Sequence, residues 1–254
     1  MTSIYGKQTE TFRFTAKDEP GRAYKACVSL CRIPMIETYN EIVNELQPPE
    51  MDYYRTLRAE RRQRSYLLGR YTAKRASALW LGEEDADKIV IDRGIFTQPI
   101  VVHAGSANIQ VSITHCGDIG ISIAFPEAMP LGIDLEKADP RQSRSLEAHM
   151  TAGELEAVRE LPYDGPAKLM VLWTAKEALS KILKTGLLIR FELLELQVCE
   201  AREGFILCSY EGFPQYRAVS FVIGEFVCSV AYPARAIIPD EDWLCFRRRL
   251  EKYI

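Results

Sequence analysis

The hydrophobic pattern of the sequence changes after Gly82, and this change constrains the fold more than any other feature. Residues 51–81 are rich in helix formers, and glycine is a common residue just beyond a helix. Short β-branched runs separated by Gly, Pro or Asn follow, and such runs are typical of strands. A group of helices followed by a group of strands predicts an α+β fold.

The second half of the chain repeats this layout. Helical patterns cover about 144–150 and 167–184, and four strand-like stretches and a terminal helix follow them. Residues 126–130, which begin and end with proline, are the candidate junction. We therefore predict two similar, pseudo-duplicated lobes, residues 1–127 and 128–254, each with helices packed on an antiparallel sheet. The similarity is one of layout, since the halves show no convincing sequence identity.

Composition excludes several classes of protein. The chain has 254 residues, of which 47% are hydrophobic and 26% charged, as in ordinary globular proteins. Its formal net charge of -3 disfavours a nucleic-acid binder. No apolar run approaches the ~20 residues that span a bilayer, so no membrane partner is expected. Residues 1–10 are polar, and the seven cysteines include no C-x-x-C pair, so we expect a reduced, cytoplasmic protein.

Two carboxylates share one face of the strand predicted at 131–136. Asp134 and Glu136 lie on this face, and Ile133 and Leu135 lie on the other, because successive side chains of a strand alternate. Neighbouring carboxylates repel each other. A hard cation such as Mg²⁺ would reconcile them, because it binds one or two carboxylates together with phosphate oxygens. On this segment alone, a solvent-exposed acidic strand face is the favoured alternative.

The helix predicted at 167–184 carries a second group of charges. Glu177 and Lys181 lie one turn apart, opposite an apolar stripe. A surface ion pair with this spacing is common and contributes only tenths of a kcal/mol. Lys176, however, falls inside the apolar stripe. A helix that carries only surface charges does not explain this position, unless the ammonium group of Lys176 reaches out to solvent.

These segments together resemble the signature of the 4′-phosphopantetheinyl transferases, specifically the long, Sfp-type class. The resemblance rests on Gly-Ile-Asp-x-Glu at 132–136 and Trp-Thr-x-Lys-Glu-Ala-x-x-Lys at 173–181. Between them, Thr-x-x-Glu at 151–154 predicts a helix start with a capping box. Ile-Thr-His-Cys-Gly at 113–117 looks like the family's Ser-His-Ser-Gly segment with Thr and Cys substituted, and Leu-Leu-Gly-Arg at 67–70 resembles its Leu-Leu-Gly helix.

The resemblance implies an enzyme that moves the phosphopantetheine arm of coenzyme A onto a serine of an acyl or peptidyl carrier protein. Adenosine 3′,5′-bisphosphate would be released, and the enzyme would be a monomer that uses Mg²⁺, with Mn²⁺ as an alternative. By resemblance, Asp134, Glu136 and Glu177 would be the metal ligands. Glu177, or a water that it holds, would accept the serine proton, and Lys181 would neutralise or protonate the leaving phosphate.

Coenzyme A also carries a 3′-phosphate, which requires cations. Residues 55–75 hold eight basic residues against one acid, and a solvated helical face is the alternative reading of such a run. The resemblance places an anion contact near Arg61 or Arg64 without deciding between them. It further implies cofactor contacts from Arg93, Gln98 (where the family has lysine), Thr114, His115 and Lys181.

Two other functions fit parts of the pattern. An acidic pair followed by Glu and Lys also describes two-metal nucleases. Those enzymes usually place Glu and Lys two residues apart on a strand, whereas here the two lie four apart on a predicted helix. A non-catalytic relative that only binds coenzyme A or a carrier protein would be expected to lack a metal ligand or the lysine, and this chain lacks neither.

Overall fold

Helices pack against antiparallel sheets throughout the protein, which confirms the predicted α+β class. The computed structural model describes residues 8–103 and 108–254, so residues 1–7 of the polar start lie outside the described residues. No helix in these ranges is long and apolar enough to cross a membrane. The chain forms two compact units, here called unit 1 (Met1–Thr15, Tyr24–Ala128 and Tyr253) and unit 2 (Ala16–Ala23, Met129–Lys252 and Ile254).

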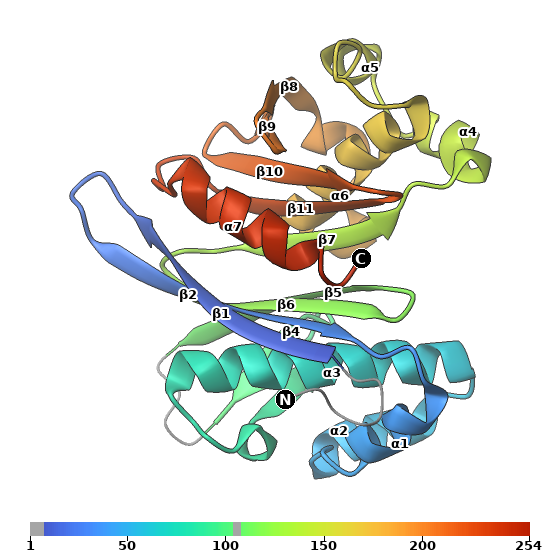
Figure 1. Ribbon diagram of the computed structural model, residues 1–254, viewed down its shortest axis with the longest axis vertical. Coiled ribbons are helices and arrows are strands. Elements are labelled where there is room, and N and C mark those ends of the chain that lie inside the picture. The colour runs from blue at the N-terminus through green and yellow to red at the C-terminus, as the bar shows by residue number, and fades with distance from the viewer. Residues whose placement is uncertain (1–7, 104–107) are drawn as a thin grey trace. The chain divides into compact units, whose positions relative to one another are not determined.

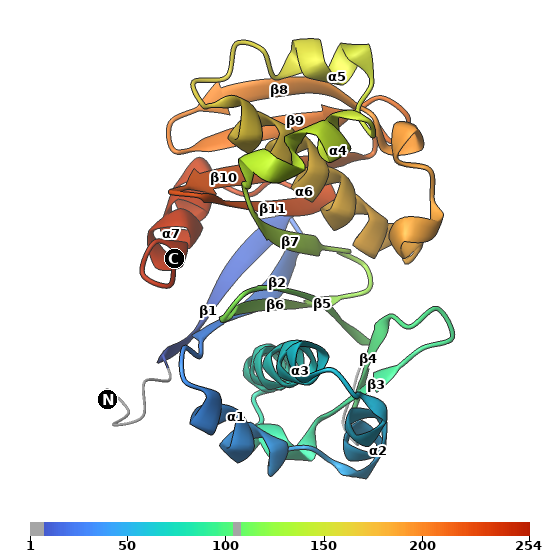
Figure 2. The ribbon, with the colours of Figure 1, turned by 90° about the vertical axis from the view of Figure 1, so that its right-hand side faces the viewer.

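Unit 1 is built around one long helix, α3, which packs on strands β5 and β6 (Figure 2). The sheet has the order β1-β2-β6-β5, and β3 and β4 form a separate hairpin. The strands are β1 (Gln8–Lys17), β2 (Ala23–Arg32), β3 (Val90–Arg93), β4 (Pro99–Val102), β5 (Ile109–Cys116) and β6 (Ile119–Pro126). The helices are α1 (Ile36–Val43), α2 (Pro48–Thr56), α3 (Glu60–Leu81) and the short 3₁₀ turn η1 (Ala86–Lys88).

Unit 2 is a five-stranded sheet with helices on both faces, and Figure 1 shows α6 and α7 on opposite sides of it. The strand order is β7-β11-β10-β9-β8. The strands are β7 (Gly132–Lys137), β8 (Leu196–Arg202), β9 (Phe205–Tyr210), β10 (Tyr216–Ile223) and β11 (Phe226–Pro233). The helices are α4 (Ser143–Glu147), α5 (Ala152–Ala157), α6 (Gly165–Leu183) and α7 (Asp240–Leu250), with 3₁₀ turns η2 (Pro140–Gln142), η3 (Gly186–Leu188) and η4 (Phe191–Leu194).

The helix-forming stretch 51–81 contains the end of one helix and the whole of another. Helix α2 ends at Thr56, because Leu57 has an extended backbone, and α3 begins after Ala59. The proline pair at 48–49 starts α2, since proline suits the first positions of a helix, where no N–H is required.

The two units share one internal arrangement. Each has a long helix packed on a central strand, and a threonine of the helix meets a serine of that strand. Thr72 contacts Ser122 in unit 1 and Thr174 contacts Ser229 in unit 2, with hydroxyl oxygens 2.7 Å apart in both pairs. Each threonine begins the tripeptide Thr-Ala-Lys, so the halves do share a short identity at equivalent places. The structure thus supports the predicted likeness of the two lobes.

A buried ion pair follows each of these threonines. Lys74 lies 2.7 Å from Glu50 in unit 1, and Lys176 lies 2.7 Å from Glu154 in unit 2. None of the four side chains is more than 1% exposed. The idea that the ammonium group of Lys176 reaches solvent is therefore wrong, because a carboxylate inside the protein neutralises it.

Each buried glutamate joins three elements of its unit. Glu154 accepts a hydrogen bond from the N–H of Thr151, which confirms the predicted capping box, and another from the N–H of Leu196 at the start of β8. Glu50 likewise accepts from Gln47 and from Ile91 in β3. Buried charges are tolerated when hydrogen bonds satisfy them in this way. A buried Lys–Glu pair thus connects the start of a short helix, a long helix and a strand in both units.

Gly132 allows β7 to lie against α6. A Cβ atom at this position would lie 1.9 Å from the carbonyl oxygen of Ala178, which belongs to the helix backbone. We expect Gly132→Ala to lower the free energy of unfolding by about 1–3 kcal/mol, because strand and helix would have to separate. Urea unfolding measures the change. Gly165→Ala is the matched control, since nothing lies within 4 Å of the added methyl group there; equal stability of the two variants would contradict the prediction.

Candidate active site

Asp134 and Lys181 meet where β7 lies along α6 in unit 2. The Nζ atom of Lys181 is 2.8 Å from Oδ1 of Asp134 and donates to the carbonyl oxygen of Ile133 at 2.6 Å. The side chain of Asp134 is 7% exposed, and that of Lys181 is 26% exposed. Asp134 sits opposite Ser229 in the β7–β11 ladder and on the α6 side of the sheet. The alternative of a solvent-exposed acidic strand face is therefore wrong for Asp134.

Glu177 lies on α6 one turn before Lys181 and is half-buried. Burial, together with the negative charge of Asp134, raises the pKa of Glu177 to about 7, against a smaller opposing effect of Lys181. A carboxyl group with this pKa can both accept and release a proton near neutral pH, which is the property required of a general base or acid. The surface ion pair considered for Glu177 and Lys181 does not form; Lys181 pairs with Asp134 instead.

The titration of Glu177 predicts how stability depends on pH. Its folded-state pKa of about 7 lies above the ordinary 4.5, so the folded protein binds the proton more tightly than the unfolded chain. The resulting stability is fully present below pH 4.5 and is lost as the pH rises to about 7. In metal-free buffer we expect the wild type to lose about 3 kcal/mol over this range relative to Glu177→Gln.

Urea unfolding of both proteins at several pH values measures this difference. Glu160→Gln, at an exposed position of the same unit, serves as the control and should follow the wild type. Parallel curves for the wild type and Glu177→Gln would contradict the prediction.

The third predicted metal ligand, Glu136, lies two residues after Asp134 on the same strand and is half-buried. Its register partner on β11 is Val227. In the described part of the chain, no three His, Cys, Asp or Glu side chains lie close enough together to hold a metal ion. The donor chemistry nevertheless suits a hard cation, since all three side chains offer carboxylate oxygens and the charge of Asp134 acts on Glu177. The three-carboxylate metal site stays a prediction.

Unit 1 contains Arg61 and Arg64, the two candidates for the predicted anion contact. Arg61 is exposed near the start of α3. Arg64 is half-buried and forms an ion pair with Glu60 one turn earlier. A phosphate at Arg64 would therefore compete with this carboxylate, whereas Arg61 forms no ion pair with another described residue. The choice between them stays open.

Arg93 and Gln98 lie on the β3–β4 hairpin of unit 1. The guanidinium of Arg93 stacks over the ring of Tyr53, 4.0 Å from its centroid. The side-chain oxygen of Gln98 accepts a hydrogen bond from the N–H of Phe96 and so supports the hairpin turn. Gln98 therefore has a local structural role here, and its predicted contact with coenzyme A stays a prediction.

Thr114 and His115 lie near the end of strand β5 of unit 1. Thr114 is buried, while His115 is exposed and lies opposite Gly120 of β6. Adjacent residues of a strand point to opposite sides, so these two side chains differ in their access to a ligand. Of the two, His115 is the accessible one.

Arg70 is a candidate that the sequence reasoning did not single out. Its side chain is buried, with 8% exposure, and its guanidinium lies 4.4 Å from the ring centroid of Tyr66. Tyr66 packs on Tyr53 with ring centroids 5.1 Å apart, and the guanidinium of Arg93 stacks on the ring of Tyr53. We call these four residues, Arg93, Tyr53, Tyr66 and Arg70, the arginine–tyrosine cluster.

The guanidinium of Arg70 has no carboxylate partner among the described residues, and its buried Nε has no hydrogen-bond acceptor there. Residues 1–7 and 104–107 contain no Asp or Glu in the sequence, so they supply no carboxylate either. Arginine stays protonated in proteins, and an unpaired buried charge is costly. The Tyr66–Arg70 spacing of one helical turn, next to the Leu-Leu-Gly motif, is the sequence signal that could have identified it.

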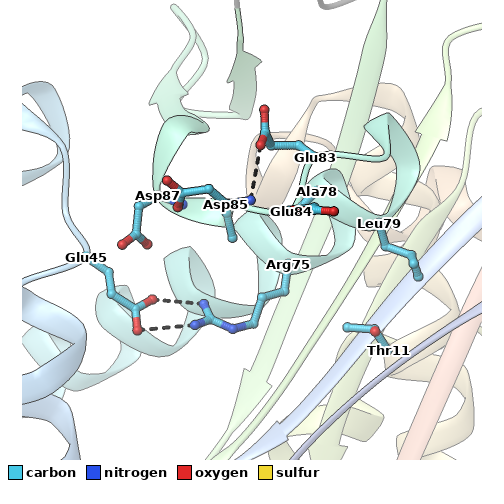
Figure 3. A pocket seen from close by; sticks show the side chains of 10 residues that line it. Thr11, Glu45, Arg75, Ala78, Leu79, Glu83, Glu84, Asp85 and Asp87 are labelled. Atoms are coloured by element: carbon cyan, nitrogen blue, oxygen red, sulfur yellow. Dashed lines mark hydrogen bonds and ion pairs between the residues drawn. The ribbon is translucent and has the colours of Figure 1, made fainter.

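A hollow of about 430 Å³ in unit 1 has none of these residues in its lining (Figure 3). The charged residues of its lining are acidic apart from Arg75, whose guanidinium is bound by both carboxylate oxygens of Glu45 at 2.9 and 3.2 Å. The other acidic residues of the lining are Glu83, Glu84, Asp85 and Asp87. None of the predicted site residues lines this hollow, and its charge disfavours the phosphates of coenzyme A.

Comparison with protein families gives a match, and it covers the part of the chain that contains the paired Asp134 and Lys181. Residues 130–231 match the family model described as the 4′-phosphopantetheinyl transferase superfamily, and no curated protein matches the chain. The matched stretch includes Glu136 and Glu177 as well. This match supports phosphopantetheinyl transfer in general and confirms the resemblance to the superfamily inferred from the motifs at 132–136 and 173–181. The Sfp type stays a prediction, as do the motifs at 67–70 and 113–117, which lie outside the matched residues. Residues 130–231 of this chain are therefore similar to the domain that defines the 4′-phosphopantetheinyl transferase superfamily.

Proposed function

We propose that this protein transfers the 4′-phosphopantetheine arm of coenzyme A to a serine of an apo acyl or peptidyl carrier protein, as an Sfp-type enzyme that releases adenosine 3′,5′-bisphosphate. The observation that carries the proposal is Glu177, a carboxyl group that titrates near pH 7 beside the Asp134–Lys181 pair in the part of the chain that matches this superfamily. We further propose a cytoplasmic location, with which seven free cysteines are consistent, and a monomeric state.

Glu177 is the proposed acceptor of the serine proton, directly or through one water. The serine hydroxyl oxygen forms a bond to a phosphorus of the coenzyme A pyrophosphate, and its proton must leave as the bond to the bridging oxygen breaks. Its pKa of about 7 in the metal-free protein means that an ionised carboxylate, which can take up this proton, is accessible at neutral pH.

Lys181 is the proposed partner of the leaving phosphate. Its ammonium group is held by Asp134 and by the carbonyl of Ile133, so its position is fixed before the substrate binds. A fixed positive charge stabilises the negative charge that develops on the leaving oxygen without having to reorganise during the reaction. Its partial exposure leaves Lys181 accessible to the phosphate.

Asp134, Glu136 and Glu177 would hold the divalent cation, Mg²⁺ or alternatively Mn²⁺. When bound, such an ion neutralises charge on the pyrophosphate and polarises the phosphorus. Two of these carboxylates already influence each other, and a cation among them would lower the pKa of Glu177.

In unit 1 we propose that the arginine–tyrosine cluster contacts a phosphate of coenzyme A. Arg70 lacks a counter-ion in the described protein, and arginine binds phosphate through two parallel hydrogen bonds. The predicted contacts at Arg61 or Arg64, Arg93, Gln98, Thr114 and His115 complete the proposed cofactor site.

Replacing Arg70 by Met tests this assignment. We expect coenzyme A binding to weaken by about 10- to 100-fold, which corresponds to the loss of one charged hydrogen-bonding group. The melting temperature should stay equal or rise, because an unpaired buried charge is removed. Isothermal titration calorimetry and a thermal melt measure the two effects. Arg62→Met, at an exposed position of α3, is the control; a large loss of stability without a loss of affinity would contradict the assignment.

The nuclease alternative is disfavoured, because Glu177 and Lys181 both lie on helix α6 rather than on a strand. The alternative of a non-catalytic relative is disfavoured, because the proposed metal ligands and the lysine are all present.

The proposed function is tested by following the nucleotide product. The protein is incubated with Mg²⁺ and coenzyme A, with and without an apo carrier protein, and adenosine 3′,5′-bisphosphate is quantified by chromatography. We expect release only when the carrier is present. Supercoiled DNA in a parallel reaction tests the nuclease alternative. Coenzyme A binding without nucleotide release on any carrier would favour the non-catalytic relative.

A further inference from the structure

Two cysteines face each other at the outer edge of the unit 2 sheet. Cys199 of β8 and Cys208 of β9 are direct partners in the antiparallel register. Their sulfur atoms lie 3.3 Å apart, and the Cys208 thiol donates to the Cys199 sulfur. All seven cysteines of the chain are free thiols in this structure.

The register and the sulfur separation of this pair are compatible with a disulfide. Directly opposite residues of an antiparallel pair have Cα atoms about 4.5–5.5 Å apart, and disulfides span Cα distances of about 4.4–6.8 Å. The sulfur atoms need to move together by little more than 1 Å to reach a bond length of about 2.05 Å. Rotation of the two side chains can supply this movement without a change of register.

The two thiols differ in access, which sets an order of reaction. Cys199 is half-buried on β8, the last strand of the sheet, whereas Cys208 is fully buried between β8 and β10. The hydrogen bond to Cys199, together with burial, raises the pKa of the Cys208 thiol well above its ordinary value. Cys199 is therefore the sulfur that a reagent in solution meets first, and Cys208 is positioned to resolve the product.

We propose that Cys199 and Cys208 form a peroxide-sensitive site of reversible disulfide formation. The Cys199 sulfur attacks one oxygen of hydrogen peroxide, the O–O bond breaks, and a sulfenic acid and one water result. The Cys208 sulfur then attacks the Cys199 sulfur, the S–O bond breaks, and the departing hydroxide takes the thiol proton to give a second water. Two thiols and one peroxide thus give one disulfide and two waters.

The disulfide would tie β8 to β9 at a structurally important place. Leu196, three residues before Cys199, donates its N–H to Glu154, the carboxylate that neutralises Lys176 next to Glu177. Oxidation would therefore attach β8, the edge strand that is hydrogen-bonded to the Lys176–Glu154 ion pair, covalently to β9.

The test treats the full chain with limiting hydrogen peroxide and measures its intact mass and a non-reducing peptide map. We expect a loss of the mass of two hydrogen atoms, a single cross-link between the peptides of Cys199 and Cys208, and reversal by dithiothreitol. Cys245→Ser, at another half-exposed cysteine, should behave like the wild type. Cys199→Ser should not lose the two hydrogens, and Cys208→Ser should keep a sulfenic acid on Cys199 that dimedone traps.

The wild-type peptide map decides the question even if a variant folds poorly. A cross-link between other cysteines, or oxygen adducts on Cys199 without a cross-link, would overturn the proposal. It would also be overturned if Cys199 and Cys208 stayed unmodified while the other five cysteines reacted.

Discussion

Glu177→Gln is expected to lower the rate of phosphopantetheine transfer by about 10²- to 10⁴-fold, which is the usual contribution of a general base. Glutamine keeps the size and hydrogen-bonding capacity of the side chain but accepts no proton. The fold should persist, because the half-buried carboxyl group is replaced by a neutral group of the same shape. Single-turnover kinetics with saturating coenzyme A and an apo carrier measure the rate of the chemical step.

Two further variants show whether the loss of rate is specific to the proposed site. Glu160→Gln removes an exposed carboxylate of the same unit and should leave the rate unchanged. Asp134→Ala should abolish transfer as well, because Lys181 loses its carboxylate partner. If Glu177→Gln transferred the arm as fast as the wild type, Glu177 would not be the proton acceptor.

Lys176→Met is expected to lower the free energy of unfolding by about 3–5 kcal/mol, because it leaves the carboxylate of Glu154 buried without its counter-charge. The loss should exceed that of any surface substitution, since Lys176 and Glu154 are both fully buried. Urea unfolding at pH 7 measures the change.

Three further variants give this prediction its controls. Lys168→Met, on the same helix but hydrogen-bonded only at the surface, should change the stability by at most about 0.5 kcal/mol. Lys74→Met should be as costly as Lys176→Met, because it breaks the equivalent pair of unit 1. The double variant Lys176→Met, Glu154→Gln should recover part of the loss. A mild effect of Lys176→Met would show that the pair contributes little.

Local patterns in the sequence predicted the elements that carry the site. Alternation placed Asp134 and Glu136 on one face of a strand, and helical spacing placed Glu177 and Lys181 one turn apart. The capping box beginning at Thr151 was also predictable, because its partners lie three residues apart. Such features depend only on neighbours in the chain.

Contacts between distant residues were not predictable in this way. The partner of Lys176 lies 22 residues before it, and Lys181 binds Asp134 across 47 residues instead of the nearby Glu177. Burial of Arg70 depends on how α2, α3 and β3 pack, which no local pattern specifies. Strand β1 was missed for a different reason: it is an edge strand in which only Phe14 and Ala16 are buried, and its β-branched residues are threonines rather than an aliphatic run.

The mass of the carrier protein tests the central claim most directly. An apo carrier is incubated with the protein, Mg²⁺ and coenzyme A, and its intact mass is measured beside a carrier whose acceptor serine is replaced by alanine. We expect the intact carrier to gain the mass of one phosphopantetheine arm and the alanine variant to gain nothing. Unchanged masses for a panel of carriers, in the presence of tightly bound coenzyme A, would contradict the proposed transferase function.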